Sequence, residues 1–96
     1  MPLHKFGFIV TGAQLAARMT MTSPAFEMVA IGVASPAEGP AAARQLVAEG
    51  VELIELCGGF GPVWTAQVLE AIDHRVPVGA VGYGPEALPG LTALFG

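Results

Sequence analysis

The segment from residue 51 to 63, VELIELCGGFGPV, decides the fold of this chain. Its first half is an apolar run typical of a buried strand, and the run ends at the only cysteine, Cys57. Three glycines follow, and Pro62 then stands where a helix can begin. A strand that passes through glycines into a helix leaves backbone N–H groups without acceptors. Such groups suit an anionic or carbonyl oxygen, so this turn predicts a binding site.

Other strands and helices flank this βα unit in alternating order. Apolar runs predict strands over residues 5–11, 26–34, 51–57 and 77–83. Capping residues and apolar stripes predict helices over residues 40–50 and 62–74, and a short last helix over 86–95. The connection from residue 12 to 24 can include a short helix over residues 13–19.

Strands that alternate with helices require right-handed crossovers and a mostly parallel sheet. The chain has 96 residues, which is the length of one small domain. We therefore predict a single α/β domain over residues 1–96, with a mostly parallel four-stranded sheet and two to three helices.

The chain carries few charges for its size. Hydrophobic residues make up 53% of it and charged residues 12%, against roughly 25% charged in ordinary globular domains. A small domain has much surface for its volume and needs polar residues to cover it. Two or three short helices also cover four strands poorly. We therefore expect the protein to bury surface against copies of itself, as a homo-oligomer.

Charge, hydropathy and cysteine content restrict the kinds of partner and the cellular compartment that we expect for this protein. No apolar run approaches the roughly 20 residues of a membrane-spanning helix. The net charge is −4 and the four basic residues form no run, which argues against nucleic acid or an acidic membrane as partner. A single cysteine cannot form an internal disulfide, so we expect the cytoplasm. The two histidines and the cysteine are spread along the sequence, so we expect neither a metal nor a cofactor.

Three of the predicted strands end in residues that can contact a ligand. In an open parallel sheet, ligands bind beyond the carboxyl ends of the strands. The first strand ends at Thr11, the third at Cys57 and the fourth at Tyr83, which bring a hydroxyl, a thiol and a phenol to one edge. The ligand-binding residues that we predict there are Thr11, Gly58, Gly59, Phe60, Gly61 and Trp64.

Glu55 is the main candidate for a chemical role. Alternation along the strand places Glu55 and Cys57 on one face. A carboxylate on a covered strand must be paired, hydrogen-bonded or protonated. Glu55 is therefore either an acid–base or ligand-anchoring group, or a structural group that is ion-paired or bonded to backbone or to a neighbouring subunit. Cys57 and Tyr83 complete the predicted catalytic set, but Cys57 also fits a small buried apolar residue. Phe60 and Trp64 likewise fit core or interface packing.

Three parts of the chain resemble a family of short bacterial proteins of unknown function. These parts are KFGFIV at residues 5–10, GVELIELCGGFG at 50–61 and VPVG at 76–79. The resemblance runs nearly end to end, and its central signature is IELCGGFG. It implies that Glu55 and residues 57–61 are motif positions, and it implies no mechanism.

The residues leave two main functions open. One is a small oligomeric enzyme, a lyase or isomerase of a small carboxylate or phosphate ester. In that enzyme Glu55 handles a proton and the amides of residues 58–61 hold an oxygen. The other is a metabolite-binding or accessory module that performs no chemistry. A purely structural oligomer is a third possibility.

Overall fold

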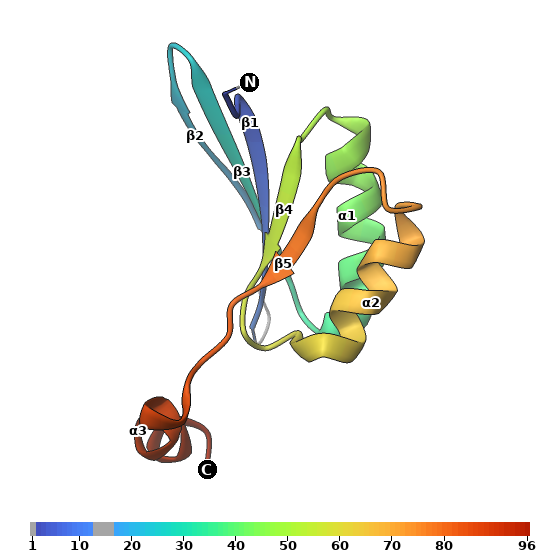
Figure 1. Cartoon of the computed structure of the whole chain (residues 1–96). Coiled ribbons are helices and arrows are strands. Elements are labelled where there is room, and N and C mark those ends of the chain that lie inside the picture. Colours follow the sequence, from blue (N-terminus) through green and yellow to red (C-terminus); the bar gives the residue numbers. More distant parts are fainter. Residues whose placement is uncertain (1, 13–16) are drawn as a thin grey trace.

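In the part of the chain that the structure describes, residues 2–12 and 17–96, five strands form one sheet, and α1 and α2 lie together on one side of it (Figure 1). The structure is a computed structural model. Its strands are β1 (Lys5–Thr11), β2 (Arg18–Ser23), β3 (Phe26–Val33), β4 (Leu53–Leu56) and β5 (Val78–Ala80). Its helices are α1 (Gly39–Ala48), α2 (Gly61–Ala71) and α3 (Leu88–Phe95), with 3₁₀ turns η1 (Pro36–Glu38) and η2 (Pro85–Ala87) before α1 and α3.

The sheet has the order β2-β3-β1-β4-β5 and is mostly parallel, as predicted. β1 is central and pairs in parallel with β3 and β4, and β4 pairs in parallel with β5. β2 runs antiparallel to β3 at the edge. The predicted count of four strands is wrong, because Arg18–Ser23, within the connection predicted over residues 12–24, forms the edge strand β2. Of the helix expected over residues 13–19, the end belongs to β2, and residues 13–16 lie outside the described chain.

The hydrophobic core lies between the sheet and the two helices α1 and α2. Its strand residues are Ile9, Val29, Val33, Ile54 and Leu56, and its other members include Ala43, Leu46, Phe60, Val68 and Ile72. Gly7 explains why α1 packs so closely on β1. A Cβ at Gly7 would lie 2.8 Å from Cδ1 of Leu46, so a larger side chain would push the helix away.

The opposite side of the sheet is covered by no helix of the described chain (Figure 1). Directly paired residues on neighbouring strands point to the same side, and the register joins Phe6 to Met28 and Met28 to Met21. The apolar residues larger than alanine on this side, which we call the open face, are Phe6, Phe8, Val10, Met19, Met21, Phe26, Met28 and Leu53. The Phe6 and Phe26 rings stack with centroids 6.4 Å apart. The apolar residues that make the sequence poor in charge thus gather on the side of the sheet that no described helix covers.

Candidate functional site

A cavity of about 610 Å³ lies where the strands end, between the sheet and α3. The part of the chain before α3 contributes Thr11, Cys57, Gly58, Gly59 and Tyr83 to its lining. α3 and the end of the chain contribute Leu91, Thr92, Phe95 and Gly96. The structure thus brings five of the nine predicted site residues around one space, which we call the carboxyl-edge cavity.

Cys57 joins β1 to β4 at the rim of this cavity. The ladder between the two strands ends at the pair Ile9 and Leu56. One step further, the backbone N–H of Thr11 donates a hydrogen bond to Cys57 Sγ at 3.2 Å, and the backbone N–H of Cys57 donates to the Ile9 carbonyl at 3.1 Å. The half-buried thiol therefore takes the place of the next ladder acceptor, which explains a sulfur atom at this position better than apolar filling does.

The glycines after Cys57 each have their own physical reason. A Cβ at Gly58 would lie 2.8 Å from Cε2 of Tyr83, and a Cβ at Gly59 would lie 2.6 Å from Cγ2 of Thr11. Gly61 has a φ of 68°, in the left-handed region that favours glycine. Two glycines thus allow the loop to pack against its neighbours, and the third sets the turn into α2.

Two backbone N–H groups in this loop are available to a ligand. Within residues 2–12 and 17–96, the N–H of Phe60 donates to the Cys57 carbonyl at 3.1 Å, whereas those of Gly58 and Gly59 have no protein acceptor. Both glycines are exposed and line the carboxyl-edge cavity. An oxygen bound there can accept hydrogen bonds from groups that are already fixed in place.

Glu55 lies outside the carboxyl-edge cavity. It is exposed on the side of β4 opposite Ile54 and Leu56, where it lines a separate hollow of about 250 Å³ with residues 79–81. The expectation that its carboxylate is covered was wrong, because α1 and α2 shield only the other side of the sheet. No ion pair to Glu55 occurs among the described residues, so the expected structural ion pair is not formed there either.

Phe60, Gly61 and Trp64 are not part of the cavity lining. Phe60 is 3% exposed and its ring packs over Gly39 at the start of α1. Trp64 is half-buried against the same core. Both aromatic residues therefore serve the packing role that the sequence left open. Gly61 lies beside Pro62 in a shallower hollow along α2.

The residues of α3 were not predicted to contact a ligand. Leu91 and Phe95 supply an apolar wall to the cavity, and Thr92 adds a hydroxyl group. The signal that the sequence offers is the apolar content of this last helix. In the structure, its residues Leu94 and Phe95 are 77% and 83% exposed. Such exposure of large apolar side chains is typical of a surface that contacts something else.

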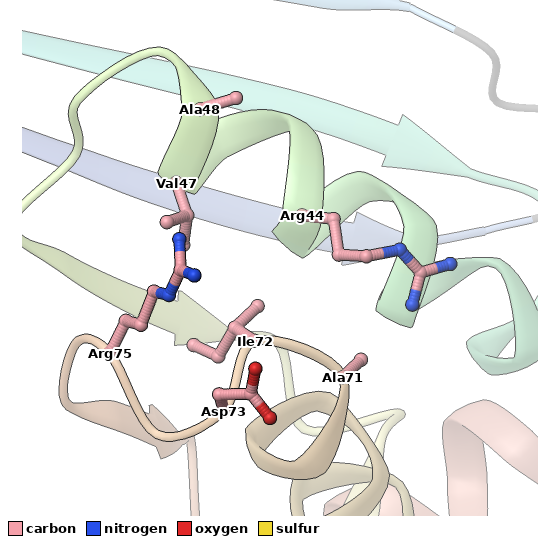
Figure 2. Close-up of a pocket in the computed structure, with 7 residues that line it drawn as sticks. All are labelled: Arg44, Val47, Ala48, Ala71, Ile72, Asp73 and Arg75. Carbon is pink, nitrogen blue, oxygen red and sulfur yellow. The ribbon is translucent and has the colours of Figure 1, made fainter.

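A second hollow, of about 340 Å³, lies between the ends of α1 and α2 (Figure 2). Its charged residues are Arg44, Asp73 and Arg75, all exposed. Figure 2 shows the Arg75 guanidinium extending toward Val47, whereas the Arg44 guanidinium points away. Since the charged groups do not converge and Asp73 would repel an anion, the carboxyl-edge cavity is the better candidate site.

Two features, a cluster of metal-ligating side chains and a membrane-spanning helix, do not occur among the described residues. Within residues 2–12 and 17–96, no three His, Cys, Asp or Glu side chains are grouped closely enough to hold a metal. Among the helices of that part, none combines the length and the apolar character that crossing a membrane requires.

The fold and the cavity define an α/β protein with a candidate binding site at the carboxyl edge of a mostly parallel sheet. The chain belongs to a family of unknown function, DUF6506, whose model matches residues 4–96. This membership confirms the expectation of a family of unknown function. No curated protein and no solved structure matches the chain. The functional argument therefore depends on the geometry of the site.

Proposed function

We propose that this protein binds a small molecule with an anionic or carbonyl oxygen in the carboxyl-edge cavity. The observation that carries the proposal is the meeting of Thr11, Cys57, the 58–59 loop and Tyr83 around one space of about 610 Å³. This volume falls within the roughly 300–1,000 Å³ of small-molecule sites. The position also agrees with the rule that open parallel sheets bind ligands beyond their strand ends.

The lining of the cavity is polar at the sheet and mostly apolar at α3, so it fits a ligand with one polar end and one apolar end. At the sheet, the N–H groups of Gly58 and Gly59 hold the oxygen, and the hydroxyl groups of Thr11 and Tyr83 are further donors. At α3, apolar side chains contact the rest of the molecule. A small carboxylate or phosphate ester with a short hydrocarbon part fits this division.

The position of Glu55 favours binding without chemistry over catalysis. Its carboxylate faces the hollow beside β5 and does not line the carboxyl-edge cavity. A general base has to come within hydrogen-bond reach of the proton that it takes. Metabolite binding is therefore our primary proposal, and a lyase or isomerase in which Tyr83 and Cys57 serve as the reacting groups is the second candidate.

We also propose that the protein works as a homo-oligomer in the cytoplasm, without nucleic acid or a membrane as partner. The support is the net charge of −4, the unpaired cysteine and the bare open face.

Ligand-observed NMR with a panel of small carboxylates and phosphate esters tests the binding site. We expect members of the panel to bind the wild type, and Gly59→Ala to weaken binding at least about tenfold, because its Cβ would collide with Thr11. Gly79→Ala is the matched control, since a Cβ there meets nothing within 4 Å. Equal binding by both variants, or no binding by the wild type at millimolar ligand, would refute the site.

Turnover of a bound compound separates the two candidates. If the protein is an enzyme, Tyr83→Phe lowers the rate while it leaves affinity within about twofold, because the lost group acts in the transition state. If the protein only binds, the wild type consumes no member of the panel and Tyr83→Phe changes affinity alone.

A further inference from the structure

The open face of the sheet is too large and too apolar to remain in contact with water. Met19 is 70% exposed, Met21 is 64% exposed and Phe26 is 37% exposed. The pairing of β1, β2 and β3 places their charged residues on the opposite side of the sheet, which α1 and α2 cover. These charged residues are Lys5, Arg18 and Glu27. Soluble monomers rarely leave a contiguous apolar surface of several hundred Å² bare, and parallel sheets are normally covered on both sides.

The area of this side of the sheet decides what can cover it. From ordinary strand spacing and rise, the five strands span a flat area of roughly 450 Å². α3 has eight residues, so it is about 12 Å long and about 10 Å wide, and it would cover only about a quarter of that area. The C-terminal helix of the same chain is therefore insufficient, and the occupant has to be another flat apolar surface of similar size.

A second copy of the chain presents such a surface. The 21 residues of β1, β2 and β3 span a flat area of roughly 330 Å², so two such sides placed together remove roughly 670 Å² of flat area from water. The relief of the side chains adds to this, toward the about 1,200 Å² of the smallest stable interfaces. A two-fold contact is self-complementary, so each methionine and phenylalanine meets its equivalents. Methionine adapts to irregular gaps, which suits the filling of such a contact.

From these observations we propose that two copies of this protein pack open face to open face, with β1, β2 and β3 at the centre of the interface. Glu55 then lies at its margin, because it is on β4, beside Phe8 of the open face. There the carboxylate keeps its access to water and is not buried unpaired. The inference deepens the proposed homo-oligomer by naming its surface, and it does not depend on the ligand site.

Size-exclusion chromatography with multi-angle light scattering on the full chain tests this interface. The wild type should elute with twice the 9.8 kDa mass of one chain, and Met21→Glu should elute with half the wild-type mass. Val63→Glu is the matched control, because Val63 is 69% exposed on α2, away from the open face, and this variant should keep the wild-type mass. Since both positions are exposed in a single copy, circular dichroism of both variants should match that of the wild type.

Three results would overturn the proposal: a monomeric wild type at micromolar concentration, a Met21→Glu variant with the wild-type mass, or an equal loss of mass in Val63→Glu. The ligand site is tested separately. Gly59→Ala should keep the doubled mass while it loses binding, so failure of one proposal does not imply failure of the other.

Discussion

The two sides of the sheet differ in what covers them: α1 and α2 pack on one side, and no described helix packs on the other. On the covered side, β1 places Gly7 and Ile9 beneath α1, where a small residue lets the helix approach and a large one fills the core. On the open face, the same strand places Phe6 and Phe8, which no helix of the described chain covers. The comparison teaches that apolar content shows where surface is buried, whereas the register of the strands shows which neighbour buries it.

Truncation of a core residue should produce the largest effect on this comparison. Ile54 is fully buried between β4 and the helices. We expect Ile54→Ala to lower the free energy of unfolding by about 2–5 kcal/mol, from lost burial and the cavity left behind. Val63→Ala, at a position 69% exposed on α2, should lower it by less than about 0.5 kcal/mol. Urea denaturation measures both, and similar losses for the two would contradict the layered core.

A smaller loss is expected from overpacking on the covered side. A Cβ at Gly39 would lie 2.5 Å from Cε2 of Phe60, whose ring is 3% exposed and cannot move aside freely. Gly39→Ala should therefore destabilise the fold by about 1–3 kcal/mol. The control Gly90→Ala, in α3 with open space around it, should instead stabilise by up to about 1 kcal/mol through helix propensity. Thermal unfolding measures the change in stability of both variants. If both were stabilised, the Phe60 ring could not pack against Gly39 as described.

The open face should make stability depend on protein concentration. If two copies bury it, the free energy of unfolding of the dimer rises by about 1.4 kcal/mol for each tenfold increase in concentration. Met21→Glu should remove this dependence. Urea titrations at several concentrations measure the effect, and a wild-type midpoint that stays constant would show that the open face is bare in solution.

The smallest expected effect concerns the amino ends of the strands, outside both faces. There the backbone N–H groups of His4 (2.6 Å) and Lys5 (2.9 Å) donate to Glu52 and lower its pKa below the ordinary value of 4.5. Because the folded pKa is the lower one, ionised Glu52 stabilises the fold above pH 4.5, and this contribution is lost as the pH falls through the folded pKa. The stability of Glu52→Gln should therefore fall less between pH 5 and pH 3 than that of the wild type. Parallel pH profiles from urea titrations would contradict this.

The strands that lie in the core could be predicted best from the sequence. The bounds of β1, Lys5–Thr11, agree with the predicted strand because a continuous apolar run marks a strand buried among neighbours. β2 was missed because its six residues are all exposed at the edge. Its alternation of Met19 and Met21 with threonines is the period of a strand, but it is short and follows a segment without clear pattern.

The part of the candidate site that follows from the direction of the strands could be predicted from the sequence. The part that depends on how many helical layers cover the sheet could not. Parallel strands end at one edge, so Thr11, Cys57 and Tyr83 could be expected together, and they do line one cavity. Whether one or two helical layers cover a sheet cannot be read from a single strand, so Glu55 was wrongly expected to be covered. The place of α3 depends on the path of residues 81–84 after β5, which no periodic pattern encodes.

The central position of β1 sets an order of events during synthesis. Its partner β3 follows within the first 33 residues, but its other partner, β4, begins only at Leu53. β1, β2 and β3 are therefore made before any part of α1 or α2 exists, and the emerging chain exposes apolar side chains in both directions. A nascent polypeptide in that condition is prone to aggregate. Production of this protein should therefore benefit from slower translation or from chaperones that hold the first three strands until the helices arrive.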